Sequence, residues 1–241
     1  MPKVFIGVGH GGSDPGATGN GFQEKDLNLS IALACRDTLA GSGVDVEISR
    51  EADITSSLEE RIRQCNQFDP DLALDVHNNA GGGDGAEVYH HYAGGTGKTL
   101  AENILSEIVA IGQNSRGTKV KLNSAGRDYF GFIRQTSAPA VIVECAFVDN
   151  ATDIQMVGTA DKQKRMGQAI ARGVLKTLGI PYQGDVNGDG KVDASDALLA
   201  LQDSVELTQL NEEQRQKADM NGDGKVDASD ALAMLQKSVG R

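Results

Sequence analysis

The stretch V-F-I-G-V-G-H-G-G-S-D-P-G-A, residues 4–17, joins a short apolar run to a glycine-rich turn. The apolar run predicts a buried strand, because such runs bounded by turn residues are typical of strands inside a sheet. His10 comes where this strand would end, and we expect Gly9, Gly11 and Gly12 to leave open space around its ring. A side chain in this position is a candidate for chemistry.

Strand and helix patterns alternate along residues 3–180. Strands are predicted at 44–48, 72–76, 86–92, 130–134 and 140–147, and amphipathic helices at 24–40, 58–65, 100–108 and 166–178. This alternation predicts an α/β fold, a mostly parallel twisted sheet flanked by helices on both faces. Ligands bind beyond the carboxyl ends of the strands in such sheets. His10, His77 and Glu144 would share that edge.

Composition narrows the class of protein. The chain has 241 residues, a net charge of −11, no tryptophan and 4% aromatic residues, which disfavours binding to nucleic acid. No apolar run reaches membrane-spanning length, so we expect no membrane insertion. Because Pro2 and Lys3 lead directly into the first strand, we expect either a trimmed export signal or another route out of the cell. Cys35, Cys65 and Cys145 are predicted to be buried thiols.

Four histidines and two glutamates are the candidates for chemistry. Catalytic zinc sites use three histidine or carboxylate ligands, for which His10 and His77 are the natural pair. Glu24 opens the first helix and either folds back toward His10 or serves only as a first-turn glutamate favoured by the helix dipole. Glu144 lies in an apolar strand, where a carboxylate is costly without a partner or a task, such as that of a general base. His90 and His91 are expected not to be ligands.

Residues 9–16, 24–28, 50–66, 75–80 and 139–150 resemble the amidase type 3 family of zinc-dependent N-acetylmuramoyl-L-alanine amidases. The resemblance implies that His10, Glu24 and His77 hold one catalytic Zn²⁺ and that Glu144 is catalytic. It also implies a peptidoglycan hydrolase that uses a zinc-activated water. The bond cleaved would join the lactyl group of N-acetylmuramic acid to L-alanine of the stem peptide. The chain departs from the family's usual residues beside His77, at 75, 76 and 78, and at Cys145.

The tail contains a repeat, D-V-N-G-D-G-K-V-D-A-S-D-A-L at 185–198 and D-M-N-G-D-G-K-V-D-A-S-D-A-L at 219–232. Oxygen ligands at positions 1, 3, 5, 7 and 12, with glycine at position 6, follow the logic of an EF-hand calcium loop. The predicted calcium ligands are Asp185, Asn187, Asp189, the Lys191 carbonyl and Asp196, then Asp219, Asn221, Asp223, the Lys225 carbonyl and Asp230.

This duplicated form, with aspartate at position 12, resembles a type I dockerin module over residues 184–240. The resemblance implies two structural Ca²⁺ ions, a small all-α module of two EF-hand-like loop–helix repeats, and docking to a cohesin domain on a scaffold protein. A calcium-stabilised module without a cohesin, or one that self-associates, is the alternative. The expected organisation is a catalytic domain at 1–180, a linker at 181–184 and the dockerin-like module at 185–241.

The sequence is also consistent with two other functions and with two routes to the place of action. One alternative is a zinc peptidase that acts on another cell-wall amide, and another is an inactive wall-binding or scaffold-docking protein. The expected place of action is the bacterial cell wall. The protein would reach it as a secreted enzyme on a scaffold or as a phage-type endolysin released through a holin.

Overall fold

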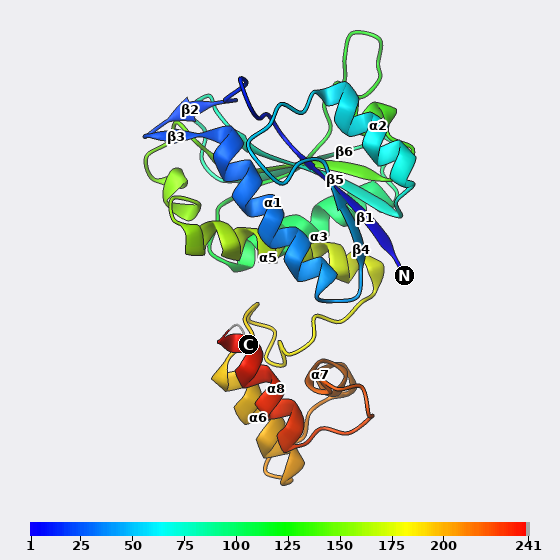
Figure 1. The fold of residues 1–241 in the computed structure, drawn as a ribbon, viewed down its shortest axis with the longest axis vertical. Helices are drawn as coiled ribbons and strands as arrows, with labels where there is room; N and C mark the ends of the chain where they lie inside the picture. The colour runs from blue at the N-terminus through cyan, green and yellow to red at the C-terminus, as the bar shows by residue number, and fades with distance from the viewer. Residues whose placement is uncertain (240–241) are drawn as a thin grey trace. The chain divides into compact units, whose positions relative to one another are not determined.

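The computed structural model describes residues 1–239 (Figure 1). The chain divides into two compact units, Met1–Leu178 and a second that begins at Gly179. The last residues of the predicted dockerin-like module, 240–241, lie outside the described residues.

The first unit is built on a six-stranded sheet in the order β4-β1-β5-β8-β6-β7. Its strands are β1 (Lys3–Val8), β4 (Asp45–Ile48), β5 (Leu72–Asn79), β6 (Ala86–His90), β7 (Ser115–Lys119) and β8 (Ala140–Phe147). All neighbours pair in parallel except β6 and β8, which are antiparallel. A separate small ribbon, β2 (Thr18–Gly19) and β3 (Phe22–Gln23), precedes the first helix. The apolar strand β8 is internal, as its sequence predicts.

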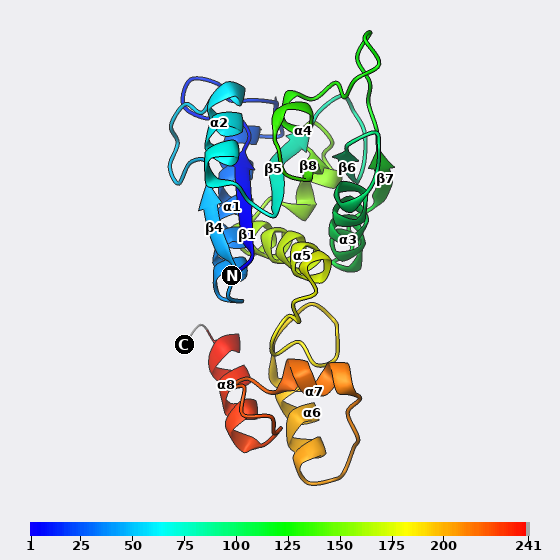
Figure 2. The same cartoon turned by 90° about the vertical axis from the view of Figure 1, so that its right-hand side faces the viewer.

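Helices cover both faces of the sheet, which confirms the predicted α/β class (Figures 1 and 2). On one face α5 (Ala160–Leu178) contacts both α1 (Glu24–Ala40) and α3 (Thr96–Ala110). The apolar stripe of α1 that predicted this helix is buried, as are the three free cysteines. α2 (Leu58–Phe68) and α4 (Gly131–Gln135) lie on the other face, and a 3₁₀ turn (Asp153–Met156) precedes α5.

The face under α2 and α4 positions the functional residues. Phe5 of β1, Ala73 of β5 and Ala140 of β8 pack there in one cluster with side chains of the two helices. Successive side chains of a strand point to opposite faces, so every second residue shares a face. His77 of β5 and Glu144 of β8 therefore follow on this same face, toward the carboxyl ends of the parallel strands.

The predicted elements and the structure differ in several places. The strand predicted at 86–92 ends at His90. Residues 130–134 were predicted as a strand, but Phe130 is the N-cap of α4 and residues 131–134 lie within this helix, where Phe132 and Ile133 are buried. Five residues are too few for their periodicity to separate strand from helix. β7 was missed because its sequence, Ser115–Lys119, is polar, as suits an edge strand. β5 runs on to Asn79, so His77 lies within the strand and not beyond it.

The second unit is all-helical, with α6 (Ala194–Ser204), α7 (Glu212–Ala218) and α8 (Ala228–Ser238). α6 and α8, the helices of the two repeats, pack together around a small buried core. The core comprises Val186, Ala197, Ala200, Leu210, Ala218, Ala231 and Met234. α7 lies between the repeats and was not predicted. None of the described helices has the length and apolar character needed to cross a membrane.

Candidate metal centre and calcium loops

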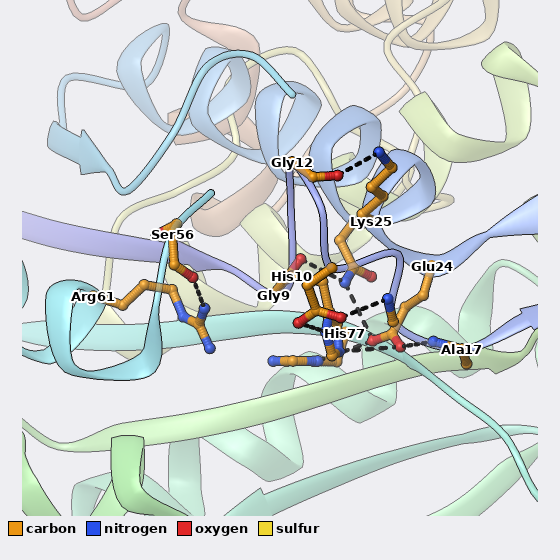
Figure 3. Close-up of polar contacts among 12 residues, drawn as sticks. Gly9, His10, Gly12, Ala17, Glu24, Lys25, Ser56, Arg61 and His77 are labelled. Atoms are coloured by element: carbon orange, nitrogen blue, oxygen red, sulfur yellow. Dashed lines mark hydrogen bonds and ion pairs between the residues drawn. The ribbon is translucent and has the colours of Figure 1, made fainter. Parts of the chain in front are cut away.

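His10 is separated from the end of β1 by Gly9 and has a positive φ of 62°, which is uncommon for a residue other than glycine. Its Nε2 atom lies 3.2 Å from Oε2 of Glu24, and its Nδ1 atom lies 2.8 Å from Oδ2 of Asp14. Both ring nitrogens therefore meet carboxylates, and the one directed at Glu24 faces the centre of the site (Figure 3).

Glu24 connects the two histidines. It is the first residue of α1 and is buried, and its Oε1 atom lies 2.9 Å from Nδ1 of His77. Backbone N–H groups of Ala17 and Asn78 also donate to this carboxylate, at 2.8 and 3.1 Å. Glu24 thus folds back toward His10, and the alternative of a glutamate that serves only the helix dipole does not describe its contacts.

His10, Glu24 and His77 offer ligand atoms that all lie within 4.8 Å of one another. No other group of three His, Cys, Asp or Glu side chains in residues 1–239 meets this condition. His90 and His91 lie elsewhere, since the ring of His90 bonds to the His91 carbonyl and His91 pairs with Asp128 at 3.1 Å. Two imidazoles and one carboxylate are the donor set of catalytic zinc sites, so these residues fit a zinc ion.

Each of the two histidines contacts a second carboxylate, on the side of its ring away from Glu24. Asp14 takes this place at His10, and Asp75 lies 3.3 Å from Nε2 of His77. Asp75 is buried and is also 3.3 Å from Nε of Arg61, which donates through Nη1 to the Ser56 carbonyl. Such partners orient a metal-binding imidazole and fix which of its nitrogens is free for the metal.

The electrostatics of the group favour an ionised Glu24 between protonated histidines. Burial opposes ionisation of Glu24, but hydrogen bonds from His10 and His77 outweigh it and hold the Glu24 pKa well below its usual range. The hydrogen bond to Glu24 raises the pKa of His10 against the effect of burial. Burial also opposes charge on His77, yet Asp75 and Glu24 raise its pKa well above the ordinary value. A bound cation would take the place of these protons.

The glycines beside His10 act differently from the prediction. A Cβ atom on Gly9 would lie 2.2 Å from Cε1 of His77, so this glycine makes room for the second histidine. Gly11 and Gly12 instead pack against the chain at Ile54 and Thr55, where a Cβ atom would lie 2.3 and 2.4 Å from the nearest atoms. They anchor the turn to a neighbouring loop.

Glu144 lies beside the group on β8. It is opposite His77 in the parallel pairing with β5 and opposite Glu87 in the antiparallel pairing with β6. Its Oε2 atom is buried and has no hydrogen-bond partner. Burial raises the pKa of Glu144 to about 7, against the opposing charge of His77. A carboxyl group with such a free oxygen and a raised pKa is suited to exchange protons near neutral pH.

Sequence reasoning assigned no role to Asp75, Arg61 or Glu87. Asp75 carried a usable signal, because a carboxylate inside the apolar strand β5 is as costly as Glu144 inside β8. Arg61 carried none, since its helix α2 reads as an ordinary amphipathic helix. Glu87 is buried on β6 and contacts Arg116 and Lys119 of β7, the strand that the sequence did not reveal.

The two repeats of the second unit fold alike. Asp196 and Asp230 are fully buried, and each accepts from a backbone N–H at the start of its own loop at 2.8 Å. Gly190 and Gly224 both have a φ of 82°, which explains glycine at position 6. The carboxylates of both loops bond to loop backbone N–H groups, including Asp185 to Gly190 at 3.1 Å. Asp193 and Asp227 cap α6 and α8.

An α/β fold that brings His10, Glu24 and His77 together beside Glu144 fits the class of metal-dependent hydrolases. Residues 4–176 match the family described as N-acetylmuramoyl-L-alanine amidase, and residues 183–238 match the type I dockerin domain. The chain therefore belongs to the N-acetylmuramoyl-L-alanine amidase family and carries a type I dockerin domain.

Individual relatives agree with this assignment. The sporulation-specific N-acetylmuramoyl-L-alanine amidase of Bacillus subtilis (strain 168) is 38% identical over 184 residues, which cover 75% of this chain and 69% of the relative. Cwp6 from Clostridium difficile has a TM-score of 0.72 at 40% identity, covering 73% of this chain and 29% of Cwp6. The N-acetylmuramoyl-L-alanine amidase AmiC2 of Nostoc punctiforme has a TM-score of 0.67 at 30% identity, covering 74% and 97%. These similarities cover about three quarters of this chain.

Proposed function

We propose that this chain hydrolyses the amide bond between the lactyl group of N-acetylmuramic acid and L-alanine of the peptidoglycan stem peptide. His10, Glu24 and His77 would hold one zinc ion, and Glu144 would be the catalytic residue. The observation that carries this proposal is the placement of Glu144, whose buried Oε2 atom has no hydrogen-bond partner, directly beside a three-ligand group.

The residues divide the chemistry between them. A zinc ion at His10, Glu24 and His77 would supply Lewis-acid activation of the water and the amide carbonyl. Glu144 accepts the proton of the attacking water and returns it to the leaving nitrogen of L-alanine. A pKa raised toward neutrality lets one carboxyl group do both, because neither protonation state is strongly disfavoured. Asp75 keeps His77 oriented through its Nε2 atom.

The direct test is product analysis on purified bacterial cell wall. Release of new amino groups on L-alanine, with intact glycan strands, supports the proposed bond. Release of D-alanine alone would identify a zinc peptidase that acts on another cell-wall amide. Binding to the wall without any new amino groups would identify an inactive wall-binding protein.

We propose that the module at 185–241, joined through the linker at 181–184, binds two structural calcium ions. Support comes from the matched folding of its loops and from the dockerin match. A cohesin domain on a scaffold protein is the proposed partner, with self-association as the alternative. Calcium-dependent binding to a panel of cohesin domains tests the first, and sedimentation of the chain alone with and without calcium tests the second.

The proposed place of action is the bacterial cell wall, outside the cell, with the enzyme secreted and held on a scaffold. The dockerin match favours this setting over that of a phage-type endolysin. The genes beside the coding sequence separate the two: scaffold genes support the first, whereas holin-like genes would indicate the second.

A further inference from the structure

The segment 111–135 has a charge opposite to that of the whole chain. It contains five basic residues and a single acidic one, Asp128, whereas the chain has a net charge of −11. The basic residues are Arg116, Lys119, Lys121, Arg127 and Arg134. We call residues 116–127 the basic loop. It includes most of β7 and the turn that follows, which a bridge between Leu122 and Asp128 closes.

The basic loop begins beside the face of the sheet that carries His77 and Glu144, which we call the catalytic face. Arg116 contacts Oε2 of Glu87 at 2.7 Å, and Lys119 contacts the same atom. Glu87 is opposite Glu144 in the β6–β8 pairing. Neighbouring strands lie about 4.8 Å apart, so β7 is about 10 Å from β8. That distance is about three residues of an extended peptide.

Aromatic contacts connect Lys121 of the basic loop, through the segment that follows the loop, to β6. The ring of Tyr89, two residues from Glu87 on β6, lies 4.7 Å from the ring of Phe130. Tyr129 lies 5.2 Å from Phe130, and Nζ of Lys121 lies 4.1 Å from the centre of the Tyr129 ring. Figure 2 shows this loop, in green, extending beyond the end of the sheet after β7. Lys121 thus lies over the rings of Tyr129 and Phe130.

Two cations of the loop are available to a ligand. Lys121 and Arg127 are exposed, and neither forms an ion pair with the residues that the structure describes. On the opposite flank, next to His10, the exposed carboxylates of Asp14 and Asp53 are paired with His10 and Lys25. The cations without an ion pair, Lys121 and Arg127, thus lie on the β7 side of the site.

We infer that Lys121 and Arg127 bind free carboxylates of the stem peptide, so that the peptide extends from the scissile amide toward β7. This inference rests on the proposed function and adds the orientation of the substrate. Stem peptides carry free carboxylates, whereas the sugar rings are mostly neutral. The unpaired cations of the basic loop would attract those carboxylates.

A pair of muramoyl peptides that differ only in a carboxylate replaced by a carboxamide tests the inference. The unaltered chain should have a lower KM for the carboxylate substrate, and added salt should reduce this preference. The double variant Lys121→Glu, Arg127→Glu should raise that KM about tenfold, leave kcat nearly unchanged and lose the preference. The double variant Lys162→Glu, Lys164→Glu, at exposed positions of α5 on the other face, makes the same change in net charge; it is the matched control and should keep the preference.

Equal KM values for the two substrates in the unaltered chain would overturn the inference, as would a preference that survives in the double variant. Calorimetry with the isolated stem peptide and its carboxamide form gives a second readout that needs no turnover. Tighter binding of the carboxylate form with no hydrolysis would refute the proposed function and leave the inference standing. Hydrolysis at the expected bond with equal KM values for the carboxylate and carboxamide substrates would support the proposed function and refute the inference.

Discussion

Asp75 lies 3.3 Å from Nε2 of His77, on the side of the imidazole ring away from Glu24. The carboxylate is buried, and Arg61 balances its charge. A proton on Nε2 is thereby held by Asp75, which leaves Nδ1 free to act as a ligand next to Glu24. The geometry of the proposed zinc site thus depends on residues that do not touch the metal.

Asp75→Asn should weaken zinc binding about ten- to a hundredfold, because the replacement removes the charge that holds the proton on His77. Competition with a chelating dye measures the affinity, and circular dichroism checks the fold. Asp14→Asn, the corresponding change at His10, should have a smaller effect since Asp14 is largely exposed. Equal zinc affinity in Asp75→Asn and the unaltered chain would contradict this role.

Glu144→Gln should lower kcat by a factor of about 10² to 10⁴ while zinc affinity stays within a few fold. The amide cannot accept the proton of the attacking water, yet it has nearly the same shape as the carboxyl group. New amino groups on purified wall and zinc content by elemental analysis are the two measurements. Undiminished turnover would remove Glu144 from the mechanism.

The acid limb of the pH profile should lie well above that of an ordinary glutamate. Burial raises the pKa of Glu144 from 4.5 to about 7, so the protonated, inactive form persists to higher pH. A bound cation favours the carboxylate, so we expect the limb between these two values. Below it, kcat/KM should fall about tenfold per pH unit. A profile that is flat down to pH 4 would contradict a raised pKa.

Gly9→Ala should abolish zinc binding, because the added Cβ atom would overlap the ring of His77. Neither the strand end nor the ring can move without displacing the ligand group. Zinc content of the purified variant and its melting temperature are the measurements. Gly97→Ala is the control: its Cβ atom would meet only an ordinary contact at 3.6 Å inside α3, where alanine is favoured over glycine. Normal zinc content in Gly9→Ala would show that His77 can shift without loss.

Calcium calorimetry should give two sites for the unaltered chain and one each for Asp196→Asn and Asp230→Asn. These carboxylates are buried and close the two loops onto α6 and α8, so each change should affect its own loop. Glu212→Gln, an exposed position on α7 outside both loops, should keep two sites. Two sites in both loop variants would refute the assignment of position 12.

Local patterns were sufficient for much of the fold. The period of Leu27, Ile31, Cys35 and Leu39 predicted α1 with the bounds the structure shows, and the apolar run 140–147 predicted an internal strand. A long, regular spacing of apolar residues predicts which face of an element is buried. The five-residue α4 was wrongly predicted as a strand, and the polar edge strand β7 was missed. Neither segment has such a period.

The sequence by itself determined the α/β alternation and the repeated loops, because both are visible as patterns of neighbouring residues. It also determined the candidate group, because residue type and motif single out His10, Glu24, His77 and Glu144. Only the tertiary structure decided that these side chains converge, that Asp75 and Arg61 support His77, and that the basic loop lies beside the catalytic face. Strand order creates these relationships. It joins residues far apart in the chain through pairings that no local pattern encodes.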